Sequence, residues 1–264
     1  MRRPAIAIIQ ARSSSSRLPG KVLKPLAGQP MIWHIVQRAR ACAQVDCVVV
    51  ATSVESSDDA LASYCNEAGI DCHRGSLENV LSRYLAVLEQ YDCPYFVRIT
   101  GDCPLIHPPF IDRQIEALIA YDADLVRCDA SSTLLEGQGA CSTRSLREVA
   151  HASNHPDDQE HVGARYYAEN PERFRIVGLQ LLQHLQDIRW RLTVDEAADY
   201  QMMATLYEAL YQGQPIKLEA VVDYLQRHPE VAAINRRVEH SAINQELGAR
   251  RAAQQPPLVG SLPW

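Results

Sequence analysis

The chain has 264 residues, 47% of them hydrophobic, which is enough apolar material for the core of one large α/β domain. Its net charge of −6 argues against general nucleic-acid binding, because nucleic-acid-binding surfaces are basic. Eight cysteines include no C-x-x-C pair, so a zinc knuckle or a disulfide framework has little support. The apolar run at 5–9 is far shorter than the about 20 residues of a membrane span, so we expect a cytoplasmic protein with no membrane partner.

Apolar, β-branched runs alternate with helical patterns through the first half of the chain. The expected strands lie at 5–10, 46–52, 70–73 and 95–100. The expected helices lie at 30–42, 57–68, 78–90 and 111–121. This alternation predicts a mostly parallel sheet that is covered by helices on both faces.

The second half of the chain is less regular. Its helical patterns lie at 146–152, 160–169, 196–210 and 218–227, with a strand at 173–179. Because no repeat or linker divides the chain, we predict one domain over 1–250 with a helical C-terminal part. Residues 251–264 contain a Pro-Pro pair and are predicted to form a loose tail.

A cation-rich loop follows the first expected strand. It carries Arg12, Arg17 and Lys21 among the serines at 13–16 and a glycine, Gly20. Open α/β sheets bind ligands beyond the carboxyl ends of their strands, and these side chains suit phosphate oxygens. A flexible, serine-rich surface loop is the alternative interpretation. The loop is neither a Walker loop nor a G-x-G-x-x-G fingerprint, so ATPase and dinucleotide-binding functions lose their main support.

Two aspartates follow strand-like segments and suit a metal ion that works on phosphates. Asp102 lies in a Gly-Asp-Cys-Pro turn after the strand at 95–100, and Asp195 follows the strand-like segment at 191–194. Proteins hold Mg²⁺ by one or two carboxylates together with phosphate oxygens and water. Each aspartate also has a structural alternative, since Asp102 fits a turn and Asp195 fits a helix N-cap.

Several motifs resemble those of one enzyme family, in the family's order, over most of residues 5–200. They are IQAR at 9–12, RLPGK at 17–21, VLKPLAGQP at 22–30, RGS at 74–76, NVL at 79–81, RITGDCPL at 98–105, EHV at 160–162 and RLTVD at 191–195. The chain resembles the cytidylyltransferases that make CMP-activated sugar acids, which include the acylneuraminate and 3-deoxy-manno-octulosonate types. The nearest match is the branch named for spore coat polysaccharide biosynthesis protein F.

The resemblance implies a three-layer, Rossmann-like fold of the nucleotide-diphospho-sugar transferase type, with a mixed, mainly parallel sheet. It also implies Mg²⁺-dependent transfer of CMP from CTP to a sugar acid or related acceptor, with release of pyrophosphate. The setting would be surface polysaccharide or glycoconjugate biosynthesis. A homodimer is expected by the same resemblance.

Site residues follow from the same motifs. The resemblance implies Asp102 and Asp195 as metal ligands, and Glu160 and His161 as acceptor-side candidates. The implied catalytic residues are Arg12, Lys21 and Asp102. The implied nucleotide-binding residues are Gln10, Ala11, Arg12, Ser16, Arg17, Gly20, Lys21, Ala51, Thr52 and Arg74. Arg98 has two equal interpretations, as a site residue or as a structural partner inside the sheet.

The sequence departs from the family pattern on the acceptor side. Cys141 lies near an expected acidic residue, Asn79 replaces a common acid, and Gly163 follows Glu-His-Val where threonine is frequent. An unusual acceptor or an altered catalytic competence follows as a hypothesis. The alternative functions are a nucleotidyltransferase with another base or a non-sugar acceptor, and a non-catalytic nucleotide-binding relative.

Overall fold

The structure is a computed structural model and describes residues 5–128 and 132–239. Its strands are β1 Ala5–Gln10, β2 Pro25–Leu26, β3 Gln29–Pro30, β4 Val45–Ser53, β5 Asp71–Gly75, β6 Tyr95–Thr100, β7 Leu125–Cys128, β8 Gln138–Ser142 and β9 Ile176–Leu179. Seven of them form one sheet in the order β5-β4-β1-β6-β8-β7-β9, and β2 pairs with β3 in a small hairpin.

The sheet is mixed and mainly parallel, as predicted. β1 pairs in parallel with β4 and β6, β4 with β5, and β7 with β9. β8 runs antiparallel to both of its neighbours, β6 and β7. The parallel strands β1, β4 and β6 therefore end at the same edge of the sheet.

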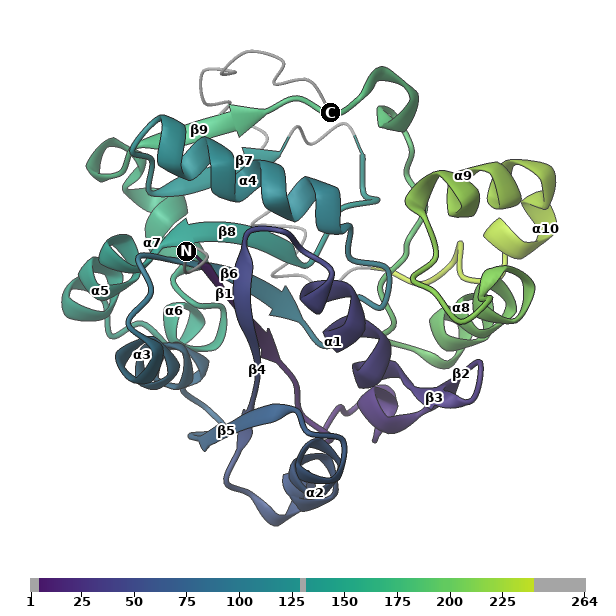
Figure 1. The fold of residues 1–264 in the computed structure, drawn as a ribbon, viewed down its shortest axis with the longest axis horizontal. Coiled ribbons are helices and arrows are strands. Elements are labelled where there is room, and N and C mark those ends of the chain that lie inside the picture. The colour runs from purple at the N-terminus through teal and green to yellow at the C-terminus, as the bar shows by residue number, and fades with distance from the viewer. Residues whose placement is uncertain (1–4, 129–131, 240–264) are drawn as a thin grey trace.

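Helices cover both faces of this sheet (Figure 1). They are α1 Met31–Arg40, α2 Asp59–Glu67, α3 Val80–Tyr91, α4 Pro108–Ala120, α5 Thr143–Ala152, α6 Pro156–Glu160, α7 Ala164–Glu169, α8 Ala197–Leu210, α9 Leu218–Arg227 and α10 Pro229–Ala232. Side chains of α1, α2 and α4 join one apolar cluster, and those of α3, α5 and α7 join another on the opposite face. The result is a three-layer α/β arrangement.

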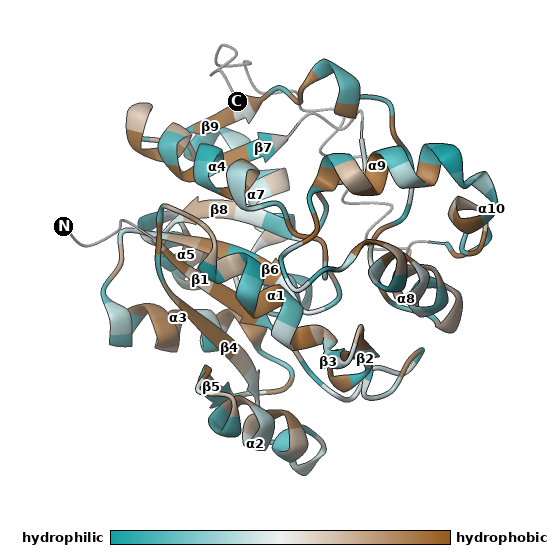
Figure 2. Ribbon diagram, turned by 45° about the vertical axis from the view of Figure 1, so that its right-hand side comes forward, coloured by the Kyte–Doolittle hydropathy of each residue, from teal (hydrophilic) through white to brown (hydrophobic). Residues whose placement is uncertain are grey.

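Side chains of the central strand β1 pack into both apolar clusters of the core. Residues 5–9 have no exposed surface, and the alternate side chains belong to different clusters. Ala7 and Ile9 pack in one cluster, whereas Ile6 and Ile8 pack in the other, as the two-residue period of a strand requires. Figure 2 shows that β1 and β4 are hydrophobic along most of their length. Burial on both faces explains why their sequences predicted them well.

Three details of the second half differ from the sequence prediction. β7 and β8 were not expected. For β8 the reason is its composition, which has glycine, alanine and serine in place of β-branched residues. Of the helix expected over 160–169, only Ala164–Glu169 is a separate helix, α7, because Val162 and Gly163 have positive φ values of 54° and 75° and divide it from α6, which ends at Glu160. Glu160 therefore ends a helix and does not begin one. The strand-like segment at 191–194 has no strand pairing.

The departures from the family pattern have local structural explanations. Gly163 needs its left-handed φ, and a Cβ there would lie 2.7 Å from a methyl carbon of Val149, so threonine does not fit. Asn79 caps α3, since its side chain accepts a hydrogen bond from Ser82 N at 2.9 Å. Cys141 lies in β8 opposite Phe96 and packs against the apolar cluster under α3.

The helical C-terminal part packs beside the sheet near the β2–β3 hairpin, as Figure 1 shows. Met203 and Leu206 of α8 and Val221 of α9 join the same apolar cluster as α1 and α4. The single domain over 1–250 stays a prediction, and the tail expected at 251–264 lies outside the described residues.

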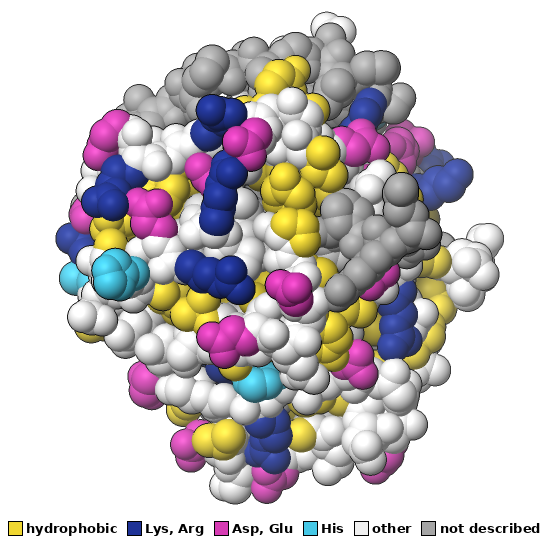
Figure 3. All heavy atoms as spheres, turned by 60° about the vertical axis from the view of Figure 1, so that its left-hand side comes forward, with side chains coloured by type: hydrophobic (Ala, Val, Ile, Leu, Met, Phe, Trp, Pro, Cys, Tyr) yellow, Lys and Arg dark blue, Asp and Glu magenta, His cyan; other side chains and the backbone are white. Residues whose placement is uncertain are grey.

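Charges of both signs are interspersed on the face shown in Figure 3, where Lys and Arg side chains lie among Asp and Glu side chains. Surface ion pairs include Arg144 with Asp122 at 2.8 Å and Arg173 with Glu148 at 2.8 Å. Within the described part of the chain, every helix is too short or too polar to cross a membrane.

Candidate active site

The turns that follow β1 and β6 lie side by side at the carboxyl edge of the sheet. Gly101 N donates a hydrogen bond to the carbonyl of Gln10 at 2.8 Å, and Ala11 N donates to the carbonyl of Ala51 in β4 at 3.2 Å. A Cβ on Gly101 would lie 2.9 Å from the Cβ of Ala11, so this approach requires glycine. The cation-rich loop therefore starts beside the turn that carries Asp102, where an open α/β sheet binds its ligand.

Hydrogen bonds tie the cation-rich loop to the fold. Gly20 N donates to the carbonyl of Ser13 at 2.9 Å, and Leu18 N donates to the hydroxyl of Ser15 at 3.3 Å. Gly20 has a φ of +68°, a left-handed value that glycine adopts without a steric penalty. Ser13 N donates to a carboxylate oxygen of Asp58 at 2.6 Å. These contacts argue against a free, flexible surface loop.

Asp58 is a buried anchor of the loop that sequence reasoning missed. It has no exposed surface, and it also accepts hydrogen bonds from the backbone N and the hydroxyl of Ser53. Burial alone would raise the pKa of Asp58, but the hydrogen bonds from Ser13 and Ser53 outweigh it and hold the pKa below its ordinary value of 3.8. In the sequence, Asp58 resembles any acidic residue at a helix start.

We expect Asp58→Asn to lower the free energy of unfolding at neutral pH by about 2 kcal/mol, because it weakens hydrogen bonds to a buried charge. The folded-state pKa lies below the unfolded one, so the stabilisation is complete above the unfolded pKa and is lost as the pH falls through the folded pKa. Urea unfolding at neutral and acid pH should therefore show that the difference in free energy of unfolding between wild type and variant becomes smaller in acid. Glu67→Gln, at an exposed position of α2, is the control and should change little. A difference in free energy of unfolding that does not change with pH would contradict the role of Asp58 as a buried, charged anchor of the loop.

Lys21 joins the two predicted metal ligands. Its Nζ lies 2.8 Å from Oδ1 of Asp195, 3.6 Å from Oδ2 of Asp102 and 2.8 Å from the carbonyl oxygen of Val194. Val194 N in turn donates to the carbonyl of Asp102 at 2.8 Å, which fixes the two aspartate-bearing segments to each other. Three segments that are far apart in the sequence thus meet at one point.

Asp195 is the carboxylate that most of the cations in this cluster contact. Arg17 lies 3.2 Å from its Oδ1, and Arg191 donates to its Oδ2. Burial would raise the pKa of Asp195, but Lys21, Arg17 and Arg191 together lower it below the ordinary value of 3.8. Asp195 is therefore a carboxylate at neutral pH, which is the form that binds a cation.

Buried polar residues hold Asp195 in place. Asp199 has no exposed surface and receives Nε of Arg191 at 3.1 Å and the backbone N of Asp195 at 3.0 Å. The side chain of Asn235 donates to Asp199 at 2.8 Å and to the carbonyl of Arg191 at 3.0 Å. The N-cap of α8 is Glu196, so the alternative that Asp195 is the helix cap is wrong.

We expect Arg191→Met to destabilise the protein by at least about 3 kcal/mol, because it leaves the buried Asp199 without its charged partner. The midpoint of urea-induced unfolding measures this loss. Arg189→Met is the matched control, since Arg189 is exposed. If the two variants were equally stable, the buried network would not support Asp195.

Gln10 and Arg98 form a hydrogen bond on the face of the sheet that α3 covers. Nε of Arg98 donates to Oε1 of Gln10 at 3.0 Å, and the hydroxyl of the buried Tyr84 donates to the same oxygen at 3.3 Å. Arg98 thus has a structural partner, which supports one of its two interpretations. Tyr84 was not identified from the sequence.

Arg12 connects the loop to the acceptor-side candidates. Its guanidinium lies 3.6 Å from Glu160, with both side chains about half exposed at 45% and 52%. Burial and the positive charges of Arg98 and Arg12 lower the pKa of His161, despite opposing effects of Glu160 and Asp157. His161 is therefore a neutral imidazole at neutral pH.

The remaining nucleotide-side candidates border β4. The carbonyl of Ala51 accepts hydrogen bonds from Ala11 N and from the buried Arg83, and Thr52 is fully buried. Arg74 donates to the carbonyl of Ser53 at 2.8 Å and pairs with Asp59 at 2.7 Å. Ser16 and Arg17 of the loop are exposed.

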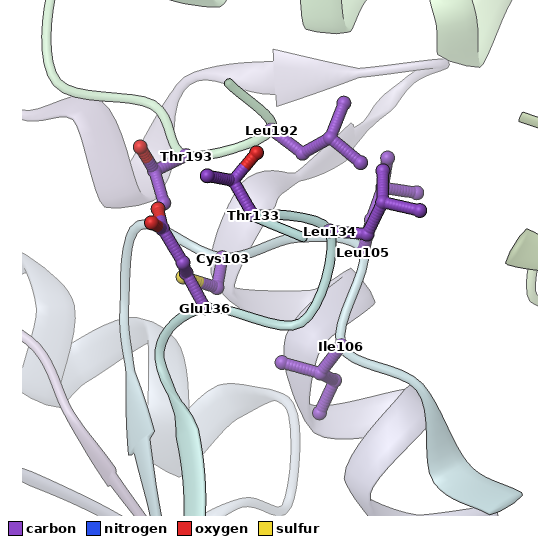
Figure 4. Close-up of a pocket in the computed structure, with 8 residues that line it drawn as sticks. All are labelled: Cys103, Leu105, Ile106, Thr133, Leu134, Glu136, Leu192 and Thr193. Atoms are coloured by element: carbon purple, nitrogen blue, oxygen red, sulfur yellow. The ribbon is translucent and has the colours of Figure 1, made fainter. Parts of the chain in front are cut away.

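A small pocket is lined in part by residues that neighbour Asp102 and Asp195 in the sequence (Figure 4). Figure 4 shows polar side chains at one end of it and apolar side chains at the other. The polar end carries Cys103, Thr133, Glu136 and Thr193, and the apolar end carries Leu105, Ile106, Leu134 and Leu192. Cys103 follows Asp102 in the chain, and Thr193 lies two residues before Asp195.

Asp102 and Asp195 fit a hard divalent cation. Their carboxylates face the same ammonium, so they converge on one point. No group of three or more His, Cys, Asp or Glu side chains suited to a metal ion occurs among the residues described. Two carboxylates, with phosphate oxygens and water completing the shell, are a typical environment for Mg²⁺.

A parallel α/β edge where a cation-rich loop faces two carboxylates suits the binding of a phosphorylated nucleotide. Residues 6–214 match the family model described as cytidylyltransferase. The chain is also 31% identical over 230 residues to the spore coat polysaccharide biosynthesis protein SpsF of Bacillus subtilis strain 168, covering 85% of this chain and 95% of that protein. The chain belongs to the cytidylyltransferase family, and it is an enzyme of that class.

Solved structures share the fold. A cytidylyltransferase from Leptospira borgpetersenii superposes with a TM-score of 0.80 and 24% identity, over 90% of this chain and all of that one. A CMP:2-keto-3-deoxy-manno-octonic acid synthetase complexed with CTP gives a TM-score of 0.58 and 19% identity, over 77% of this chain and 98% of that one. Both have a Rossmann-like fold of the nucleotide-sugar transferase type, as the sequence predicted.

Proposed function

We propose that this enzyme transfers CMP from CTP to a sugar acid or related acceptor and releases pyrophosphate, with Mg²⁺ bound by Asp102 and Asp195. The observation that carries the proposal is the convergence of both carboxylates on the ammonium of Lys21. Support for CTP and a sugar acid comes from the family and from the synthetase that was solved with CTP. The likeness to SpsF supports a role in polysaccharide biosynthesis.

In this reaction an acceptor oxygen attacks the α-phosphorus while pyrophosphate leaves, and the obstacle is negative charge on both partners. Arg12, Arg17 and Lys21 would bind the triphosphate and stabilise the charge that develops on the leaving pyrophosphate. Ser16 and the backbone at Gly20 would add donors to the phosphates. When bound, Mg²⁺ polarises phosphoryl oxygens and neutralises their charge.

The nucleoside is proposed to lie over the ends of β1, β4 and β5. Gln10, Ala11, Ala51 and Thr52 border this region, and Thr52 would take part through its backbone because its side chain is fully buried. Arg74 is the weaker candidate, since its guanidinium already bonds Ser53, Glu55 and Asp59.

The acceptor is proposed to approach the carboxylates from the side of Glu160 and His161. A homodimer remains part of the proposal on the resemblance, and a cytoplasmic location remains part of it on the shortness of the apolar run at 5–9.

We expect Asp102→Asn to reduce Mg²⁺-dependent pyrophosphate release from CTP by about a hundredfold or more, because one of two metal carboxylates is lost. The fold should persist, since Asp102 is only half-buried in a turn. Release of pyrophosphate is measured with CTP and a panel of sugar acids. Asp187→Asn is the control, because Asp187 is exposed and its left-handed φ of 59° tolerates asparagine. Full activity in Asp102→Asn would overturn the metal assignment.

Lys21→Ala should weaken binding of CTP more than binding of CMP, because its ammonium is proposed to act on the outer phosphates. Calorimetric titration with each nucleotide in the presence of Mg²⁺ measures the two affinities. Equal losses for CTP and CMP would argue against a role of Lys21 at the triphosphate.

A further inference from the structure

The ammonium of Lys21 lies where a metal ion held by Asp102 and Asp195 would lie. It contacts a carboxylate oxygen of each aspartate, at 3.6 and 2.8 Å, and the carbonyl oxygen of Val194 at 2.8 Å. Its side chain is only 10% exposed, so it is packed into this position. An ammonium is a compact point charge that prefers oxygen partners, as Mg²⁺ does.

Both carboxylates already have positively charged partners without a metal. Lys21, Arg17 and Arg191 all contact Asp195, and Lys21 also contacts Asp102. A divalent cation that entered beside Lys21 would share the same oxygens with another cation and be repelled by it. The metal therefore has to displace this lysine before it can bind both aspartates.

A triphosphate offers Lys21 another set of oxygens. Lys21 begins a short 3₁₀ turn, Lys21–Leu23, directly after Gly20, and so belongs to the backbone of the cation-rich loop. Its Nζ would leave the carboxylates for the phosphates that are proposed to bind this loop. The anionic nucleotide also adds ligands and negative charge for the metal.

We propose that Lys21 acts as an internal cation in the nucleotide-free enzyme, so that divalent metal binds only together with the nucleotide. The inference rests on the proposed metal site at Asp102 and Asp195. Because coupling between ligands is reciprocal, nucleotide must raise the affinity for metal by the same factor by which metal raises the affinity for nucleotide. In the absence of nucleotide, divalent metal then does not displace Lys21 from Asp102 and Asp195.

Binding of Mn²⁺ alone tests this directly, with the free Mn²⁺ counted by its electron paramagnetic resonance signal. In the absence of nucleotide we expect Lys21→Met to bind Mn²⁺ about tenfold or more tightly than wild type, because the competing charge is gone. Lys21→Gln is a second, polar replacement and should show the same direction. Lys24→Met is the matched control, since the ammonium of Lys24 lies 5.3 Å from the Tyr200 ring and not on the carboxylates. Adding Asp102→Asn to Lys21→Met should remove the gained site.

The outcomes separate this inference from the proposed function. If CTP makes wild type bind Mn²⁺ beyond the amount that the same CTP binds without protein, but both Lys21 variants, folded by circular dichroism, bind Mn²⁺ in the absence of CTP no better than wild type does, the internal-cation role is overturned and the metal site stands. If wild type binds Mn²⁺ equally well with and without CTP, the coupling is overturned. If neither wild type nor the Lys21 variants bind Mn²⁺ even with CTP, the metal assignment itself is wrong.

Discussion

The contact of one lysine with two carboxylates organises the edge of the sheet in this enzyme. Lys21 comes from the loop after β1, Asp102 from the turn after β6, and Asp195 from the segment before α8. Nothing but the fold brings these three groups together, because they are separated by most of the chain. The hydrogen bond from Val194 N to the carbonyl of Asp102 holds the two aspartate-bearing segments together, so both carboxylates remain directed at the same cation.

Buried carboxylates support this edge from below. Asp58 holds the backbone of the loop at Ser13, and Asp199 holds the backbone at Asp195 while neutralising Arg191. A buried carboxylate that accepts several N–H groups is a rigid support, because each bond is strong in a region of low dielectric and each is costly to break. The exposed side chains, Arg12 and Arg17, are thereby mounted on a backbone that is fixed beneath them.

Much of this could be predicted from the sequence, for physical reasons. β1 and β4 are apolar on both faces, so their composition alone marks them, and the motifs around Lys21, Asp102 and Asp195 identified residues that do converge. β8 escaped prediction because its glycine, alanine and serine are not the β-branched or aromatic residues that signal a strand. Asp58 and Asp199 escaped because their importance lies in partners, such as Ser13 at a separation of 45 residues, that only the fold reveals. The broken helix at 160–169 depends on two positive φ values, of which only the one at Gly163 has a sequence signal.

The central claim is that the loop and the two carboxylates form a CTP site that uses Mg²⁺. Calorimetric titration of the protein with CTP, UTP, ATP and GTP, each with and without Mg²⁺, tests it without knowledge of the acceptor. The account predicts selective binding of CTP that Mg²⁺ strengthens. Preference for another triphosphate would contradict the assignment of the base, and no binding of any of the four would contradict the site itself.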